Sequence, residues 1–183
     1  MEMALLAESS ITFPFDFLKT IIKPDAVYIQ WHDQTFKAAI GKNGVIAAED
    51  KVEGDLKTPM GSYRVTHGYY RPDKMDCPQS IIPFTALDPT FGWCDEPSHP
   101  LYNQQVLKPF DASHEDLWSD DDVYDVILVT DHNTNPIVPG KGSAVFIHVA
   151  REDFEPTAGC LALQKEDLLM IIENCSSELV WLV

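Results

Sequence analysis

A histidine and a cysteine near the C-terminal end are the residues whose types and spacing best suit covalent chemistry. In the stretch IHVAREDFEPTAGCLAL (147–163), His148 lies in an apolar run and Cys160 follows a turn of small residues. A thiol becomes a useful nucleophile when a base lies within reach and its thiolate is stabilised. A strand ending near His148, followed by a return loop, can bring the two side chains together. The pair therefore predicts Cys160 as a nucleophile with His148 as its base.

The neighbours of Cys160 favour this interpretation. Gly159 allows the backbone to bend closely or to adopt a positive φ, and Ala158 and Ala162 leave room for a substrate carbonyl. The amide groups at Gly159 and Cys160 are candidates for an oxyanion hole. The alternative stays open at this point, because a histidine in an apolar strand is often a core residue and a free cysteine often packs as a small hydrophobic residue.

The elements that position this pair are predicted to be mainly β-strands. The Asn-Gly dipeptide within 42–45 is typical of a hairpin turn, and it predicts that a strand at 35–41 pairs with one that runs on through 45–52. Runs of β-branched, aromatic and apolar residues predict further strands at 26–31, 123–130, 142–150 and 178–183. A strand also follows the loop that begins at Gly54. With no βαβ alternation, the sequence predicts a single mainly β domain over 1–183.

One helix is predicted after Cys160. In 165–175, the residues Leu168, Ile171, Ile172 and Cys175 recur at helical spacing and so share one face. Cys175 is therefore expected to be a packed thiol.

A proline-rich region at 72–120 separates the two halves of the chain. Each proline removes a backbone donor and restricts the residue before it, so regular structure should be short here. Long loops inside a compact domain are usually functional, and we expect this region to form the wall of a binding cleft. Trp93, Tyr102 and Asn103 within it are candidates either for substrate contact or for anchoring the loops.

Composition excludes several classes of function. The formal charge of -16 and the pI near 4.5 argue against binding to nucleic acid or to anionic membranes. No stretch approaches the ~18 apolar residues of a membrane-spanning helix. The N-terminal residues lack the basic start and apolar core of a signal peptide, so the chain as given is expected to be soluble.

Cysteine usage does not indicate a metal site. The four cysteines are widely spaced, with no pair at zinc-binding spacing, so free thiols are the default expectation. The acidic run at 114–125 lacks the ligand spacing of an EF-hand and is read as a solvated surface. No metal or organic cofactor is predicted, and the sequence does not indicate an oligomeric state.

Two motifs resemble those of a known family. The segment SAVFIHVAREDFEPTAGCLAL is similar to the catalytic segment of the YkuD-type L,D-transpeptidases, whose signature is a histidine, a loop, and then Ser/Thr-His-Gly-Cys, an apolar residue, Arg and an apolar residue. Thr157, Gly159, Cys160, Leu161 and Leu163 match this signature, and His148 is the upstream histidine. GDLKTPMGSYRV resembles the family's Lys-Thr-Pro-x-Gly segment through Lys57, Thr58, Pro59 and Gly61.

The resemblance covers about residues 26–176 and includes departures. Ala158 replaces the histidine of the triplet, Ala162 replaces the arginine, and the loop before Cys160 is shorter than in typical exported members. The segments HVAR…PTAGC-x-AL and GWCD…YN indicate a divergent branch.

The resemblance implies a β-sandwich fold and acyl transfer on peptidoglycan stem peptides through a Cys160 thioester, with no cofactor. Thr157 and Arg151 join the candidates for substrate binding, Arg151 as a partner for a stem-peptide carboxylate or as a surface charge. The family suggests the cell envelope, and a cytoplasmic location stays open. The alternatives are an L,D-carboxypeptidase, another amide-cleaving acyltransferase, and a non-catalytic domain that binds peptidoglycan or a partner protein.

Overall fold

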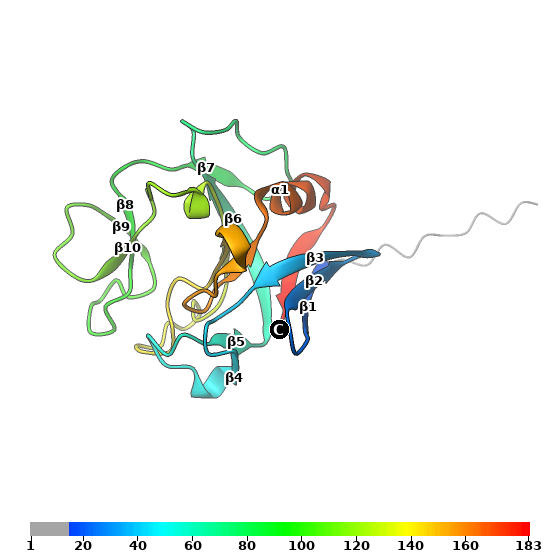
Figure 1. Ribbon diagram of the computed structural model, residues 1–183. Helices are drawn as coiled ribbons and strands as arrows, with labels where there is room; N and C mark the ends of the chain where they lie inside the picture. Colours follow the sequence, from blue (N-terminus) through cyan, green and yellow to red (C-terminus); the bar gives the residue numbers. More distant parts are fainter. Residues whose placement is uncertain (1–14) are drawn as a thin grey trace, which may run out of the picture.

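A single large sheet dominates the structure, a computed structural model that describes residues 15–183 (Figure 1). Its strands are hydrogen-bonded in the order β11-β12-β13-β3-β2-β1-β14-β6-β7, and β6 pairs with β11 as well. The sheet therefore closes on itself around a shared core. Its members are β1 (Phe15–Ile22), β2 (Val27–Trp31), β3 (Gln34–Ala39), β6 (Ser62–Tyr70), β7 (Phe84–Ala86), β11 (Val126–Thr130), β12 (Phe146–Val149), β13 (Leu161–Leu163) and β14 (Glu178–Leu182).

The main core lies inside this closed sheet and is completed by one helix. Leu18, Ile29, Ile147 and Trp181 come from four different strands, and each is fully buried. Helix α1 (Lys165–Asn174) buries Leu168, Ile171 and Ile172 against the same core. The mainly β fold, with its main helix after Cys160, is confirmed.

Strand β11 is buried on both faces, because a second core lies on its outer side. Val126 and Leu128 pack into the main core, whereas Ile127 and Val129 pack into the second core. This arrangement explains the continuous apolar run of β11, since alternation of polar and apolar residues is lost when neither face of a strand meets water. The second core also contains Tyr69, Leu87, Trp93, Leu117, Phe146 and Cys160.

The proline-rich region supplies the cover for this second core. It contains short strands only, as the prolines predict, and three of them form a small sheet in the order β10-β8-β9. Trp93 of this sheet packs edge-to-face on Phe146 of β12, with ring centroids 5.0 Å apart. In Figure 1 the small sheet lies on the side of the molecule away from α1. The strands are β8 (Phe91–Cys94), β9 (Gln105–Leu107) and β10 (His114–Asp116).

The predicted Asn-Gly hairpin is wrong. The turn forms, with the Gly44 amide donating to the Gly41 carbonyl, but β4 (Val45–Ala47) pairs in parallel with β5 (Thr58–Met60) and not with β3. A 3₁₀ turn at Ala48–Asp50 then ends the predicted longer strand. The reason is that the backbone directly after β3 has partners other than β4. Gly41 forms a bridge with Thr157, and the Gly41 amide donates to the Thr58 hydroxyl.

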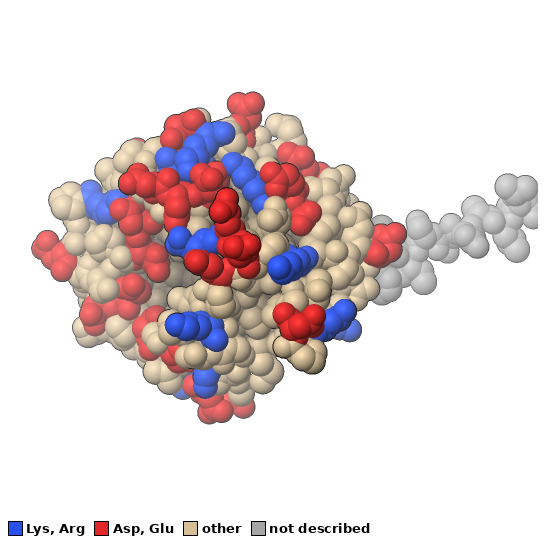
Figure 2. Space-filling model, in the orientation of Figure 1, with Lys and Arg blue, Asp and Glu red and all other residues tan. Residues whose placement is uncertain are grey.

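The surface is predominantly acidic. Figure 2 shows Asp and Glu side chains spread over one face of the molecule, with Lys and Arg among them. Within residues 15–183, no helix is long and apolar enough to cross a membrane.

Candidate active site

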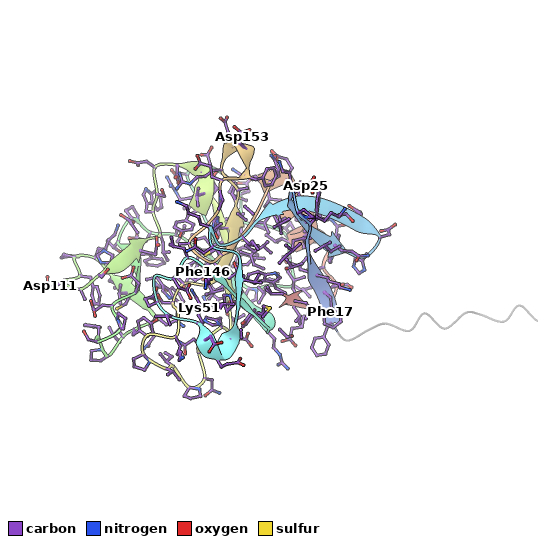
Figure 3. All side chains as sticks on the ribbon, turned by 60° about the horizontal axis from the view of Figure 1, so that its bottom comes forward. Phe17, Asp25, Lys51, Asp111, Phe146 and Asp153 are labelled. Atoms are coloured by element: carbon purple, nitrogen blue, oxygen red, sulfur yellow. The ribbon has the colours of Figure 1, made fainter. Side chains whose placement is uncertain are left out.

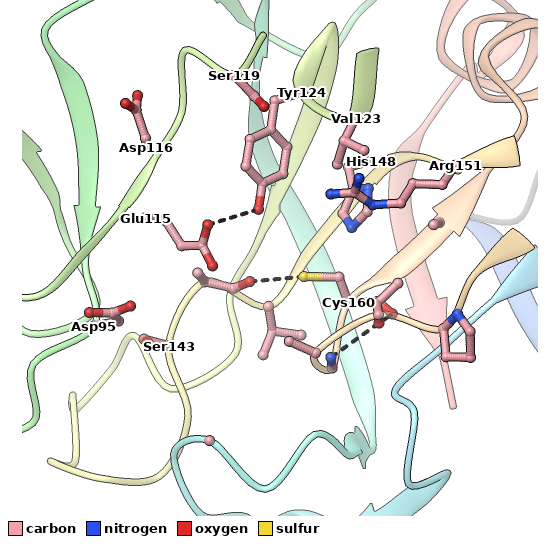
Figure 4. A pocket seen from close by; sticks show the side chains of 18 of the residues that line it. Asp95, Glu115, Asp116, Ser119, Val123, Tyr124, Ser143, His148, Arg151 and Cys160 are labelled. Atoms are coloured by element: carbon pink, nitrogen blue, oxygen red, sulfur yellow. Dashed lines mark hydrogen bonds between the residues drawn. The ribbon is translucent and has the colours of Figure 1, made fainter. Parts of the chain in front are cut away.

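Neighbouring strands bring His148 and Cys160 to the same face of the sheet. Strands β12 and β13 run in parallel, with Ile147 opposite Leu161 and His148 opposite Ala162. Ile147 and Leu161 point into the main core, so His148 and Ala162 must point away from it. Cys160 lies two residues before Ala162 and faces the same way. Both His148 and Cys160 line a cleft of about 470 Å³ (Figure 4).

Cys160 is held as a thiol in the free site. Its Sγ donates to the Ala144 carbonyl at 3.1 Å and accepts from the Phe146 amide at 3.4 Å. Burial raises the pKa of the thiol to about 12, the nearby Glu115 carboxylate acts in the same direction, and the Phe146 amide and Lys51 oppose the shift. Little thiolate is therefore present at neutral pH without substrate.

The His148 imidazole is neutral in this structure. Its Nδ1 lies 2.9 Å from the Val149 carbonyl, which can only accept, so Nδ1 carries the hydrogen and Nε2 is the acceptor. Burial lowers the pKa of the imidazole to about 4, and the Val149 hydrogen bond only partly offsets that shift. The Tyr124 ring meets the imidazole edge-on at 5.5 Å between centroids. The cleft thus contains a neutral imidazole and a neutral thiol whose hydrogen bonds the Ala144 carbonyl. General-base activation requires this hydrogen to turn from Ala144 to His148 Nε2 during attack.

Gly159 is required by the close approach of two segments before Cys160. Its φ is +149°, and a Cβ at this position would lie 2.9 Å from the Lys57 carbonyl oxygen. The Gly159 amide donates to the Thr157 hydroxyl at 3.1 Å, and that hydroxyl donates to the Cys160 carbonyl at 2.7 Å. Thr157 therefore closes the turn, although it also lines the cleft. The sequence predicted an oxyanion hole from the amides of Gly159 and Cys160. In this structure the Gly159 amide instead donates to the Thr157 hydroxyl.

Thr58 of the Lys-Thr-Pro segment ties this turn to the rest of the fold. Its fully buried hydroxyl accepts from the Gly41 amide and donates to the Gly159 carbonyl, each at 2.9 Å. Thr58 thus stabilises the backbone turn that precedes Cys160. Thr58 itself does not line the cleft.

Replacing Thr58 with Val should destabilise the protein and slow any reaction at Cys160. The change leaves the Gly41 amide and the Gly159 carbonyl without their buried partner, at a cost of on the order of 2–4 kcal/mol in the free energy of unfolding. Urea denaturation measures this cost. Thr58→Ser keeps the hydroxyl and is the matched control, and equal losses in both variants would contradict the hydrogen-bond account.

The other predicted substrate contacts divide into two groups. Arg151 lines the cleft and forms an exposed ion pair with Asp121 at 2.9 Å. Trp93, Tyr102 and Asn103 are buried and do not line the cleft. The Trp93 indole donates to the Asn103 side chain at 2.9 Å, and Asn103 in turn bonds the loop at 132–144. These hydrogen bonds favour the anchoring role for Trp93 and Asn103. The Tyr102 hydroxyl donates to the Glu53 carboxylate.

Several side chains of the cleft were not singled out from the sequence. Tyr124 sits in a short 3₁₀ segment, and Lys51 is buried in an ion pair with Asp55. Glu115 and Glu53 also line the cleft. Glu115 belongs to the acidic run at 114–125, and the interpretation of that run as a solvated surface is wrong for this residue, which lines the cleft. Nothing local to Lys51 indicates its burial.

The comparison with protein families identifies the class of protein. The chain matches the L,D-transpeptidase catalytic domain, YkuD, over residues 23–180, and it belongs to this family. Members are typically cysteine-dependent transpeptidases that act on peptidoglycan, so L,D-transpeptidase-type activity is indicated for this chain. No curated protein and no solved structure matches it significantly.

The two departures from the family signature both lie in the cleft. Ala158 and Ala162 line it, and Ala162 is the direct strand neighbour of His148. Small side chains therefore occupy positions where the signature has a histidine and an arginine. Arg151, three residues after His148, also lines the cleft and brings a positive charge to it.

Proposed function

We propose that this protein is a cysteine L,D-transpeptidase that acts on peptidoglycan stem peptides through a thioester on Cys160. The observation that carries the proposal is the placement of a nucleophile and a neutral base on one face of adjacent strands, in one cleft, in a chain of the YkuD family.

The first half-reaction forms the acyl-enzyme. Cys160 Sγ attacks the carbonyl carbon of the L-residue in an L–D peptide bond, and its proton passes to His148 Nε2. The tetrahedral intermediate then collapses, the C–N bond breaks, and the departing amine takes the proton from His148. The products are a thioester on Cys160 and a free D-residue.

The second half-reaction transfers the acyl group. An acceptor amine attacks the thioester carbonyl and gives its proton to His148. The C–S bond breaks, and the departing Cys160 thiolate takes this proton from His148, which restores both neutral groups. The new bond is an amide. Arg151, at the His148 end of the cleft, suits a carboxylate of the stem peptide, since guanidinium groups bind carboxylates in bidentate geometry.

A carboxypeptidase is the second candidate, because water can replace the amine with the same residues in the same roles. The small and exposed side chain of Ala158, where the family signature has a histidine, favours this alternative because it leaves room for water at the cleft. A non-catalytic domain that binds peptidoglycan would need neither His148 nor Cys160.

Product analysis separates these possibilities. The protein is incubated with a stem tetrapeptide that ends in an L–D bond, with and without a D-amino acid as acceptor, and the products are resolved by mass spectrometry. We expect release of the terminal D-residue and an exchanged amide when the acceptor is present. A hydrolysed tripeptide alone would identify a carboxypeptidase, and an unchanged tetrapeptide would contradict the proposal.

A further inference from the structure

A buried lysine lies against the two segments that hold the Cys160 thiol. Lys51 follows the 3₁₀ turn at Ala48–Asp50 and lines the cleft, yet it is only 4% exposed. Figure 3 shows Lys51 toward the centre of the molecule, whereas Asp111 and Asp153 lie at its periphery. Lysine is almost never this buried unless it is paired. Neither half-reaction described above uses Lys51.

The ammonium group of Lys51 is held by its own loop. It forms an ion pair with Asp55 and donates to the Val52 carbonyl at 3.4 Å. The Asp55 carboxylate also accepts from the Val52 amide at 3.1 Å and from the Lys57 amide at 2.9 Å. These contacts close the loop at 51–57 on itself and fix the place of the ammonium group.

The Lys51 side chain packs against two glycines, one in each segment at the thiol. A Cβ at Gly142 would lie 3.0 Å from Lys51 Cε, and a Cβ at Gly159 would lie 3.7 Å from Lys51 Nζ. Gly142 lies two residues before Ala144, whose carbonyl accepts from the thiol, and Gly159 directly precedes Cys160. Lys51 therefore contacts the segment of the nucleophile and the segment of its hydrogen-bond acceptor.

Stability alone does not account well for the pair of Lys51 and Asp55. Taking two charges out of water is costly, and well-packed apolar residues can often replace a buried ion pair without loss of stability. The same burial makes the charge effective on its neighbours, because screening is weak in a low dielectric. Burial raises the pKa of the Cys160 thiol, and Lys51 opposes this shift.

The other titratable groups around the thiol do not supply a buried positive charge. Glu115 of β10 acts on the thiol in the opposite direction to Lys51. Among the described residues of the cleft lining, Lys51 and Arg151 are the cations, and Arg151 is exposed and paired with Asp121. The remaining titratable groups that face the cleft near the thiol are acidic or neutral: Glu53, Asp95, Tyr124 and His148.

His132 is the titratable group that packs beside Lys51. A Cβ at Gly142 would lie 3.0 Å from its Nε2 as well as from Lys51 Cε. The Nε2 atom donates to the Lys141 carbonyl at 3.0 Å, and burial lowers the pKa of His132, with Lys51 acting in the same direction. His132 is therefore neutral at pH 7, and the positive charge at this place comes from Lys51.

We propose that Lys51 is a positioning residue for Cys160. Its side chain sets the spacing of the two segments that hold the thiol, and its ammonium group stabilises the thiolate that forms when the thioester C–S bond breaks. The inference rests on the proposed function, since it takes Cys160 as the nucleophile, and it assigns the ion pair with Asp55 the role of holding a buried cation near that nucleophile.

Alkylation of Cys160 by iodoacetamide tests this role without a peptide substrate, because its rate follows the fraction of thiolate. The reaction is run between about pH 7 and 9 in a Cys77→Ala background, which removes the exposed thiol, and is followed on the peptide that contains Cys160. Lys51→Met keeps the length of the side chain and removes its charge. We expect the rate to fall about three- to tenfold at every pH in this range, since the thiolate loses a nearby positive charge.

Asp55→Asn distinguishes the charge of Lys51 from the stability of the ion pair. Both single variants break the pair and should lower the midpoint of thermal denaturation, but Asp55→Asn keeps the ammonium group, so its alkylation rate should not fall. Lys51→Met combined with Asp55→Asn leaves neither charge buried without its partner and should again be slow. Lys19→Met, an exposed change on β1, is the charge-matched control and should keep the wild-type rate.

Release of the D-residue from a stem tetrapeptide is measured on the same variants. We expect kcat to fall in Lys51→Met with little change in KM, because Lys51 acts through Cys160. Equal slowing of alkylation in Lys51→Met and Asp55→Asn would overturn the inference, and so would a wild-type rate of alkylation or of release in Lys51→Met. Failure of the proposed function gives a different result, in which the wild-type protein leaves the tetrapeptide intact while alkylation of Cys160 still depends on Lys51.

Discussion

We expect Cys160→Ala to lower the release of the D-residue from a stem tetrapeptide by at least about 10³-fold, because the proposed thioester forms on the Cys160 sulfur. The measurement is the initial rate of D-alanine release. The fold should survive, since the change removes one buried sulfur and its weak hydrogen bonds and costs about 1 kcal/mol.

The other cysteines provide the controls for this variant. Cys94 and Cys175 are buried and do not line the cleft, and Cys77 is exposed. Cys77→Ala should therefore retain full activity. Retention of activity in Cys160→Ala, or its loss in Cys77→Ala, would show that the nucleophile lies elsewhere.

His148→Asn should lower kcat/KM by about 10²–10⁴, the usual contribution of a general base. Asparagine is chosen because its amide can still donate to the Val149 carbonyl as Nδ1 does, so the variant removes Nε2 with little change in packing. Thermal denaturation checks that the fold is kept.

The pH profile distinguishes loss of a base from a structural defect. The base must be neutral, and burial lowers the pKa of His148 to about 4, so wild-type activity should persist below pH 6.5 and fall only as the pH approaches that lowered pKa. In His148→Asn this acid limb disappears. The residual rate should instead rise about tenfold per pH unit, since the pKa of Cys160 near 12 leaves only thiolate formation to drive the attack. An acid limb that persists in the variant would assign the base to another residue.

The sequence was sufficient to predict a strand that carries His148 and to single out His148 and Cys160, which line one cleft, whereas strand β13 directly after Cys160 was not predicted. His148 and Cys160 were recognisable because an apolar strand and a small-residue turn surround them, and the family motif covers both. The long apolar helix face after Cys160 was equally clear, since Leu168, Ile171 and Ile172 follow a strict period.

Local patterns failed where long-range contacts decide the structure. The Asn43-Gly44 turn formed, but the partner of β4 was set by Thr58 and Thr157, which are distant in the chain. Strand β1 was not predicted, because its run FDFLKTII alternates only weakly and owes its place to β2 and β14.

Local sequence patterns also could not separate residues that line the cleft from residues that anchor its loops. Trp93 and Asn103 were expected near substrate as readily as in a loop anchor, and only their mutual hydrogen bond and burial distinguish the two. The small sheet formed by β10, β8 and β9 contacts the main sheet through the packing of Trp93 against Phe146, a contact between segments more than fifty residues apart. No local signal reports such a contact.

Intact-mass spectrometry after a brief incubation with a stem tetrapeptide or a carbapenem tests the central claim most directly. The account predicts a covalent adduct that peptide mapping places on Cys160, that is absent in Cys160→Ala and that forms much more slowly in His148→Asn. An adduct on Cys94 or Cys77, or one that forms at the wild-type rate without His148, would contradict it.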